Sequence, residues 1–96
     1  MFVGVCKISI SIPGAQSLKE KRSVVQRVKQ KVLNQFKILV SEVGALQNYE
    51  LAELAFASVS SDENFIRDLI SKIQTFIESS EGLRIIFDRS EILQYE

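Results

Sequence analysis

Two segments of this chain repeat apolar residues with the spacing of a helix, and each lies between segments in which apolar and polar residues alternate. In the first, the apolar stripe is Leu18, Val25, Val28, Val32 and Phe36; in the second it is Phe65, Ile66, Leu69, Ile73, Phe76 and Ile77. Residues three or four apart share one face of a helix, whereas residues two apart share one face of a strand. The pattern therefore predicts two amphipathic helices, each placed between strands.

The alternating segments predict four strands, at residues 2–12, 36–43, 51–60 and 83–95. In the first strand Cys6, Ile8, Ile10 and Ile12 share one parity, so we expect them to face the core. In the third strand we expect Ala55, Ala57 and Val59 to face the helices, because small side chains allow a helix to approach a sheet closely. Phe56 then points to the other face of the sheet.

The predicted order of elements is strand, helix, strand, strand, helix, strand. With right-handed crossovers, two interleaved strand–helix–strand units form a four-stranded antiparallel sheet with both helices on one face. The sequence thus predicts a single ferredoxin-like α+β domain over residues 1–96. This architecture carries many different functions, so the fold alone assigns none.

The start of the first helix carries an unusual set of charges. A Pro13-Gly14 turn precedes it, and Ser17 and Glu20 have the spacing of a capping box. The next residues include Lys19, Lys21 and Arg22, although the N-terminus of a helix disfavours bases by roughly 0.3–1 kcal/mol each. We expect these bases and the free amides of the first turn to form an anion site.

The charge distribution extends this expectation along the whole helix. Residues 1–40 hold eight bases and one acid, whereas residues 41–96 hold four bases and eleven acids. The predicted anion- or RNA-binding surface consists of Lys19, Lys21, Arg22, Arg27, Lys29 and Lys31. Two other interpretations stay open: the bases form a solvated helix face, or they attract an acidic partner, including the acidic half of a second copy.

A second predicted surface lies on the face of the sheet that the helices leave uncovered. The apolar residues expected there are Val3, Val5, Leu39, Phe56 and Ile86. Exposed apolar patches of this kind often mark interfaces, so we expect a homodimer. RNA-binding modules of this topology stack bases on aromatic side chains, but only Phe56 is a candidate for that role here.

The residue types that are absent restrict the chemistry. The chain has no histidine and one cysteine, which excludes a Ser-His-Asp triad, His-ligated metals and an internal disulfide within one chain. A carboxylate pair such as Glu42 and Glu53 is the remaining option for acid–base chemistry. We therefore expect a protein that is not an enzyme, with no cofactor and no metal, with no membrane association, in the reducing cytoplasm.

Several sequence blocks, "PGAQSLKEKRSVV", "VSEVG" and "AELAFASVSSD", resemble the YlxP-like family of small bacterial proteins over nearly the whole chain. The resemblance implies a ferredoxin-like fold and a cytoplasmic bacterial protein without established catalytic residues. It also implies a link to translation, since family members are often encoded beside initiation and ribosome-maturation factors. The resulting hypothesis is an accessory protein that binds RNA or ribosomal particles through its basic first helix. The alternative is a homodimeric interaction or regulatory module without a nucleic-acid role.

Overall fold

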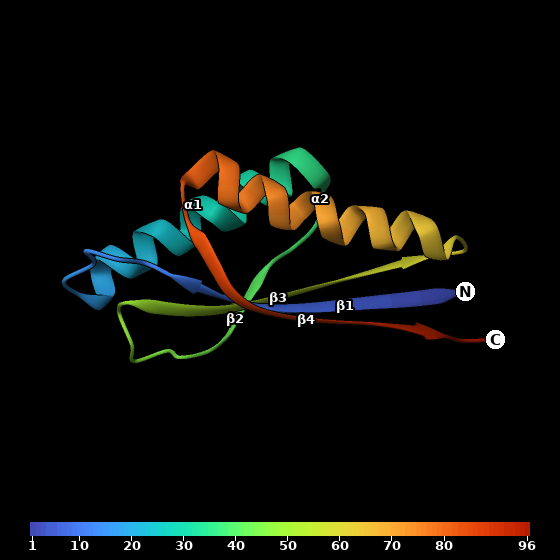
Figure 1. Ribbon diagram of the computed structural model, residues 1–96, viewed down its shortest axis with the longest axis horizontal. Helices are drawn as coiled ribbons and strands as arrows, with labels where there is room; N and C mark the ends of the chain where they lie inside the picture. Colours follow the sequence, from blue (N-terminus) through green and yellow to red (C-terminus); the bar gives the residue numbers. More distant parts are fainter.

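The computed structural model describes residues 1–96 as two layers, a sheet and a pair of helices that cover one of its faces (Figure 1). The elements, in chain order, are β1 (Phe2–Ser11), α1 (Leu18–Phe36), β2 (Ser41–Gly44), β3 (Leu51–Ser60), α2 (Glu63–Glu81) and β4 (Arg84–Gln94). Both termini lie at the same end of the sheet, where the Met1 and Tyr95 backbones exchange hydrogen bonds. Neither helix is long and apolar enough to cross a membrane.

The sheet is antiparallel, with the strand order β2-β3-β1-β4. Its core side combines alternate residues of β1 with the apolar stripes of both helices. The buried apolar residues are Cys6, Ile8, Ile10, Ile12, Val25, Val28, Val32, Val40, Ala52, Leu54, Phe56, Ile66, Ile70, Ile73 and Ile77. The predicted ferredoxin-like fold is confirmed, as is the burial of Cys6, whose side chain is 2% exposed.

The predicted orientation of β3 is wrong. Phe56 pairs with Cys6 across the sheet, is 5% exposed, and faces the helices, whereas Val59 is 61% exposed. The close approach of a helix is made possible by Gly4 instead of by the alanines of β3. A Cβ atom at Gly4 would collide with the Ile66 side chain of α2. Leu54 and Phe56 thus fill the core together with Ala52, whereas Ala55 and Ala57 lie on the open face.

The second strand is shorter than the sequence pattern indicates. α1 continues to Phe36 and ends at Lys37, whose φ of 60° is left-handed, so the chain forms no strand until Ser41. Val40 is buried, although it lies in the connection before β2. β2 pairs only with residues 53–55 of β3.

The start of α2 also differs from the prediction, which assigned the cap to Ser60 with Glu63 or to Ser61. Asp62 is the N-cap, and its carboxylate accepts hydrogen bonds from the Asn64 and Phe65 amides. The Ser60 hydroxyl accepts a hydrogen bond from the Asp62 amide, one residue outside the helix. Ser60 therefore orders the approach to the helix without capping it.

Candidate nucleic-acid interface on the first helix

The N-terminus of α1 already holds an anion of its own chain. The Ser17 hydroxyl accepts a hydrogen bond from the Glu20 amide at 3.1 Å, as the capping box predicts. The Glu20 carboxylate accepts from the Gln16 amide, one residue before the N-cap. A carboxylate at this end of a helix is favoured by the helix dipole. The first turn is thus partly neutralised by Glu20 before any partner binds.

Lys21 does not belong to an exposed anion site, and this part of the prediction is wrong. Its side chain is 1% exposed, and its ammonium donates hydrogen bonds to the carbonyls of Ala45, at 2.6 Å, and Asn48, at 2.7 Å. The Glu42 Oε2 atom lies 2.9 Å from Nζ. All three partners belong to β2 or the loop that follows it. Lys21 therefore fastens the β2–β3 loop to α1, and its charge is fully engaged inside the protein.

Arg27 and Lys31 point towards α2, where they share one carboxylate. Arg27 Nε lies 3.2 Å and Lys31 Nζ 2.8 Å from oxygens of Glu81, whose side chain is 7% exposed. The Lys31 ammonium, helped by Arg27, lowers the pKa of the Glu81 carboxyl, although partial burial acts in the opposite direction. These two bases thus connect the C-terminal end of α2 to α1 while remaining partly exposed.

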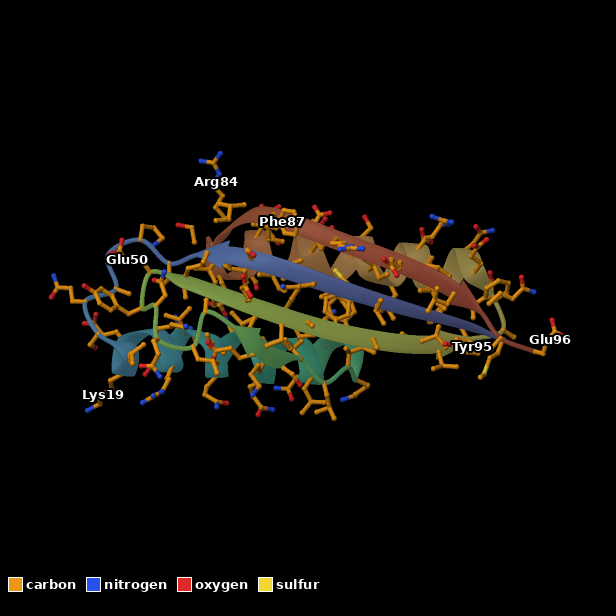
Figure 2. The ribbon with its side chains drawn as sticks, turned by 90° about the horizontal axis from the view of Figure 1, so that it is seen from below. Lys19, Glu50, Arg84, Phe87, Tyr95 and Glu96 are labelled. Carbon is orange, nitrogen blue, oxygen red and sulfur yellow. The ribbon has the colours of Figure 1, made fainter.

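The remaining bases of the predicted set, Lys19, Arg22 and Lys29, form no ion pair. At 100° per residue they fall on one side of α1, opposite to the side that carries Arg27 and Lys31. Figure 2 shows Lys19 at the start of α1, pointing away from the sheet on the side remote from α2. We call Lys19, Arg22 and Lys29 the outer flank of α1. Lys19 and Arg22 are exposed and Lys29 is half-buried.

The carboxylate pair considered for acid–base chemistry is not brought together. Glu42 lies opposite Leu54 in the sheet and forms its ion pair with Lys21 on the helix side. Glu53 lies on the open face, where its carboxylate is 3.5 Å from Lys7. Since each carboxylate is already paired with a different lysine, the two form no common site.

The predicted dimer residues divide between the open face and the core. Val3 and Val5 share the open face with Val59 and Leu93, while Phe56 is excluded by its burial. Leu39 is 76% and Ile86 54% exposed. The structure also has an open groove of about 760 Å³ between β1, β3 and the α1–β2 connection, which the sequence did not predict. It is lined by Val5, Cys6, Lys7, Lys37, Ile38, Leu39, Ser41, Val43, Ala55, Phe56, Ala57, Arg89 and Glu91.

Comparison with solved structures supports the fold alone. The chain is similar to a designed protein with a ferredoxin fold, at a TM-score of 0.54 and 17% identity, over 97% of this chain and 84% of the design. A VAO-type flavoprotein from Myceliophthora thermophila also matches, at a TM-score of 0.58 and 11% identity, over 96% of this chain. The chain spans only 16% of the length of that flavoprotein.

Sequence comparison identifies a relative of nearly equal length. The uncharacterized protein YlxP of Bacillus subtilis (strain 168) is 29% identical over 90 residues, which cover 94% of this chain and 98% of YlxP. The family model described as "Protein of unknown function (DUF503)" matches residues 3–89. Because this match covers almost the whole domain, the chain belongs to the DUF503 family.

Proposed function

We propose that the protein is a non-enzymatic accessory protein of the cytoplasm that binds RNA or ribosomal particles through the outer flank of α1. The observation that carries the proposal is the charge state of this flank. Lys19, Arg22 and Lys29 have no counter-charge, whereas every other base on α1 is paired with a carboxylate. Bases that a fold does not use internally are available to a polyanion, and phosphate contacts supply affinity with little reading of sequence.

The paired bases Arg27 and Lys31 add positive charge to α1, although the proposal does not depend on them. Arg27 and Lys31 together face only Glu81, so this side of α1 also keeps a positive excess. α1 itself contains one acid, Glu20, in its first turn. A phosphate backbone lying along the outer flank would therefore meet positive charge from Lys19 to Lys29, and the excess at Arg27 and Lys31 lies on the opposite side of the helix.

The test compares two triple variants of equal charge. The first changes Lys19, Arg22 and Lys29 to Ala; the control changes Lys72, Arg84 and Arg89 to Ala, outside α1. Binding to fluorescently labelled ribosomal RNA and to purified ribosomal subunits is measured by anisotropy and co-sedimentation over a range of salt concentrations. Far-UV circular dichroism checks that both variants fold.

We expect the first variant to lose at least about ten-fold in affinity, with a salt slope shallower by about one phosphate contact per lost base. The control should retain most of its affinity. Equal losses in the two variants would show that only bulk charge matters, and a wild-type protein that binds neither probe would refute the proposal.

A further inference from the structure

β3 is longer than the strand beside it, and one end of its outer edge has no neighbour. β1 pairs with β3 along the full length Leu51–Ser60, but β2 reaches only residues 53–55. Residues 56–60 of β3, which we call the free edge, therefore have a paired strand on one side only. Figure 2 shows β3 continuing past the end of α1, so the helix does not cover this edge either.

The hydrogen-bond pattern identifies the backbone groups that the free edge presents. Met1 and Tyr95 exchange both backbone hydrogen bonds, so odd-numbered residues of β1 bond to β4 and even-numbered residues bond to β3. The bond from the Ile12 amide to the Glu50 carbonyl, at 2.9 Å, agrees with this alternation. In β3 the peptide groups of Ala57 and Val59 therefore point outward, and no backbone hydrogen bond outside the regular elements reaches either residue.

This edge lacks the features with which proteins usually prevent strand pairing. Charged side chains, proline and bulges protect exposed edges from other strands. β4, at the opposite edge of the sheet, carries Arg84, Asp88, Arg89 and Glu91 and has a register shift opposite Ser9 and Ile10. The free edge reads Phe-Ala-Ser-Val-Ser, with no charge, no proline and no register shift. It is the one part of the sheet boundary that is both extended and unprotected.

We propose that the free edge pairs antiparallel with the free edge of a second copy of this chain. With Ser58 facing Ser58 across a two-fold axis, Ala57 of one copy lies opposite Val59 of the other. Both residues direct their peptide groups outward, so each exchanges two backbone hydrogen bonds with its counterpart. The pairing is self-complementary, as an isologous dimer requires. It creates one continuous sheet of two copies.

The side chains favour a second copy over an unrelated strand. No charge lies on the free edge, so the two-fold pairing sets no like charges opposite one another. Val59, 61% exposed, extends the apolar strip of Val3 and Leu93 on the open face into the neighbouring copy.

The variant Val59→Pro tests this interface selectively. Because the Val59 amide points outward, proline at this position removes no hydrogen bond to β1, and proline is accepted on edge strands. It does remove one intermolecular donor from each copy. Val59→Thr is the matched control, since it keeps the amide and the β-branched shape.

Mass is measured by light scattering and analytical ultracentrifugation from 1 to 200 µM, roughly the range of ordinary dimer affinities. We expect wild type and Val59→Thr to reach twice the chain mass of 10.9 kDa. The dissociation constant of the Val59→Pro dimer should be at least about thirty-fold higher than that of wild type, since two hydrogen bonds are lost. As a second measurement that needs no variant, amide exchange at Ala57 and Val59 in the wild type should slow as concentration rises.

Three outcomes would overturn the proposal. The first is a wild type that stays monomeric over the whole range. The second is a Val59→Pro dimer of unchanged affinity, which would place the interface elsewhere, for instance on the open face around Val5. The third is exchange at Ala57 and Val59 that does not depend on concentration, and this outcome decides the question even if Val59→Pro fails to fold. Exchange that slows only when another protein is added would assign the edge to that partner instead.

Discussion

Replacing Lys21 with Met is the most direct test of how this domain holds its β2–β3 loop. Met keeps most of the length and the apolar character of the side-chain stem but removes the ammonium that contacts Ala45, Asn48 and Glu42. Breaking one partner of a buried ion pair typically destabilises a protein by about 3–5 kcal/mol. Here the loss should be smaller, because Glu42 keeps 19% of its side chain in water and the exposed loop can open to hydrate both carbonyls.

We therefore expect Lys21→Met to lower the free energy of unfolding by about 2–3 kcal/mol, a large share of the roughly 5–15 kcal/mol of an ordinary domain. Urea unfolding followed by circular dichroism measures the loss, with Lys19→Met as the control at an exposed position. Hydrogen exchange should rise in residues 45–50 before any other segment.

A double variant separates the ion pair from other effects. When both charges are replaced, as in Lys21→Met with Glu42→Leu, no unpaired charge remains buried, so the combined loss should be smaller than the sum of the two single losses. If the free energy of unfolding of Lys21→Met lies within about 0.5 kcal/mol of the wild-type value, as is usual for surface substitutions, the reasoning from burial fails. Strict additivity of the two substitutions would also refute the pairing as the source of the effect.

Three further outcomes follow from the core and the helix contacts. Cys6 is 2% exposed, so a thiol reagent should label it only at the rate of unfolding, and fast labelling of native protein would contradict its burial. Gly4→Ala should destabilise the fold by about 1–3 kcal/mol through its clash with Ile66, whereas Gly14→Ala, with open space around it, provides a control for backbone strain alone. The pKa of Glu81 is lowered in the folded state, so its contribution is present above its ordinary value of 4.5 and is lost as the pH falls through the folded value. The stability difference between wild type and Glu81→Gln should therefore shrink in acid, and a difference independent of pH would show that the carboxylate charge is not involved.

The sequence predicted the order of the elements because apolar residues recur every three or four positions in both helices, whereas apolar and polar residues alternate in β1. It could not predict the orientation of β3, since both faces of that strand are apolar. Ala55 and Ala57 share one face, and Leu54 and Phe56 share the other. The residue that allows a helix to approach the sheet lies on a different strand. It is Gly4 of β1, where a Cβ atom would collide with Ile66 of α2.

The candidate site was predictable in its composition but not in its geometry. Lys21 lies four residues before Val25, at the start of the stripe that Val25, Val28 and Val32 continue, and this position was a signal that its side chain would face the core. Its partner Glu42 is distant in sequence, and only the return of β2 beside α1 brings the two together. The pairing of Arg27 and Lys31, which distinguishes them from the outer flank, likewise depends on Glu81, at the far end of α2.

The two proposed interfaces lie on the same side of the molecule and can be separated by their positions along it. α1 runs in the same direction as β3, so its first turns, with Lys19 and Arg22, lie at the end of the sheet remote from the free edge (Figure 2). Lys29 lies nearer to the place where a second copy would join. A dimer would hold two such helices on one face of a continuous sheet, so that a long polyanion could contact both. Val59→Pro should therefore keep the affinity of each chain for a short RNA and lose the additional affinity of the dimer for ribosomal particles. Loss of short-RNA binding in a folded Val59→Pro monomer would mean that the basic surface is completed by the second copy, with Lys29 as the residue most directly involved.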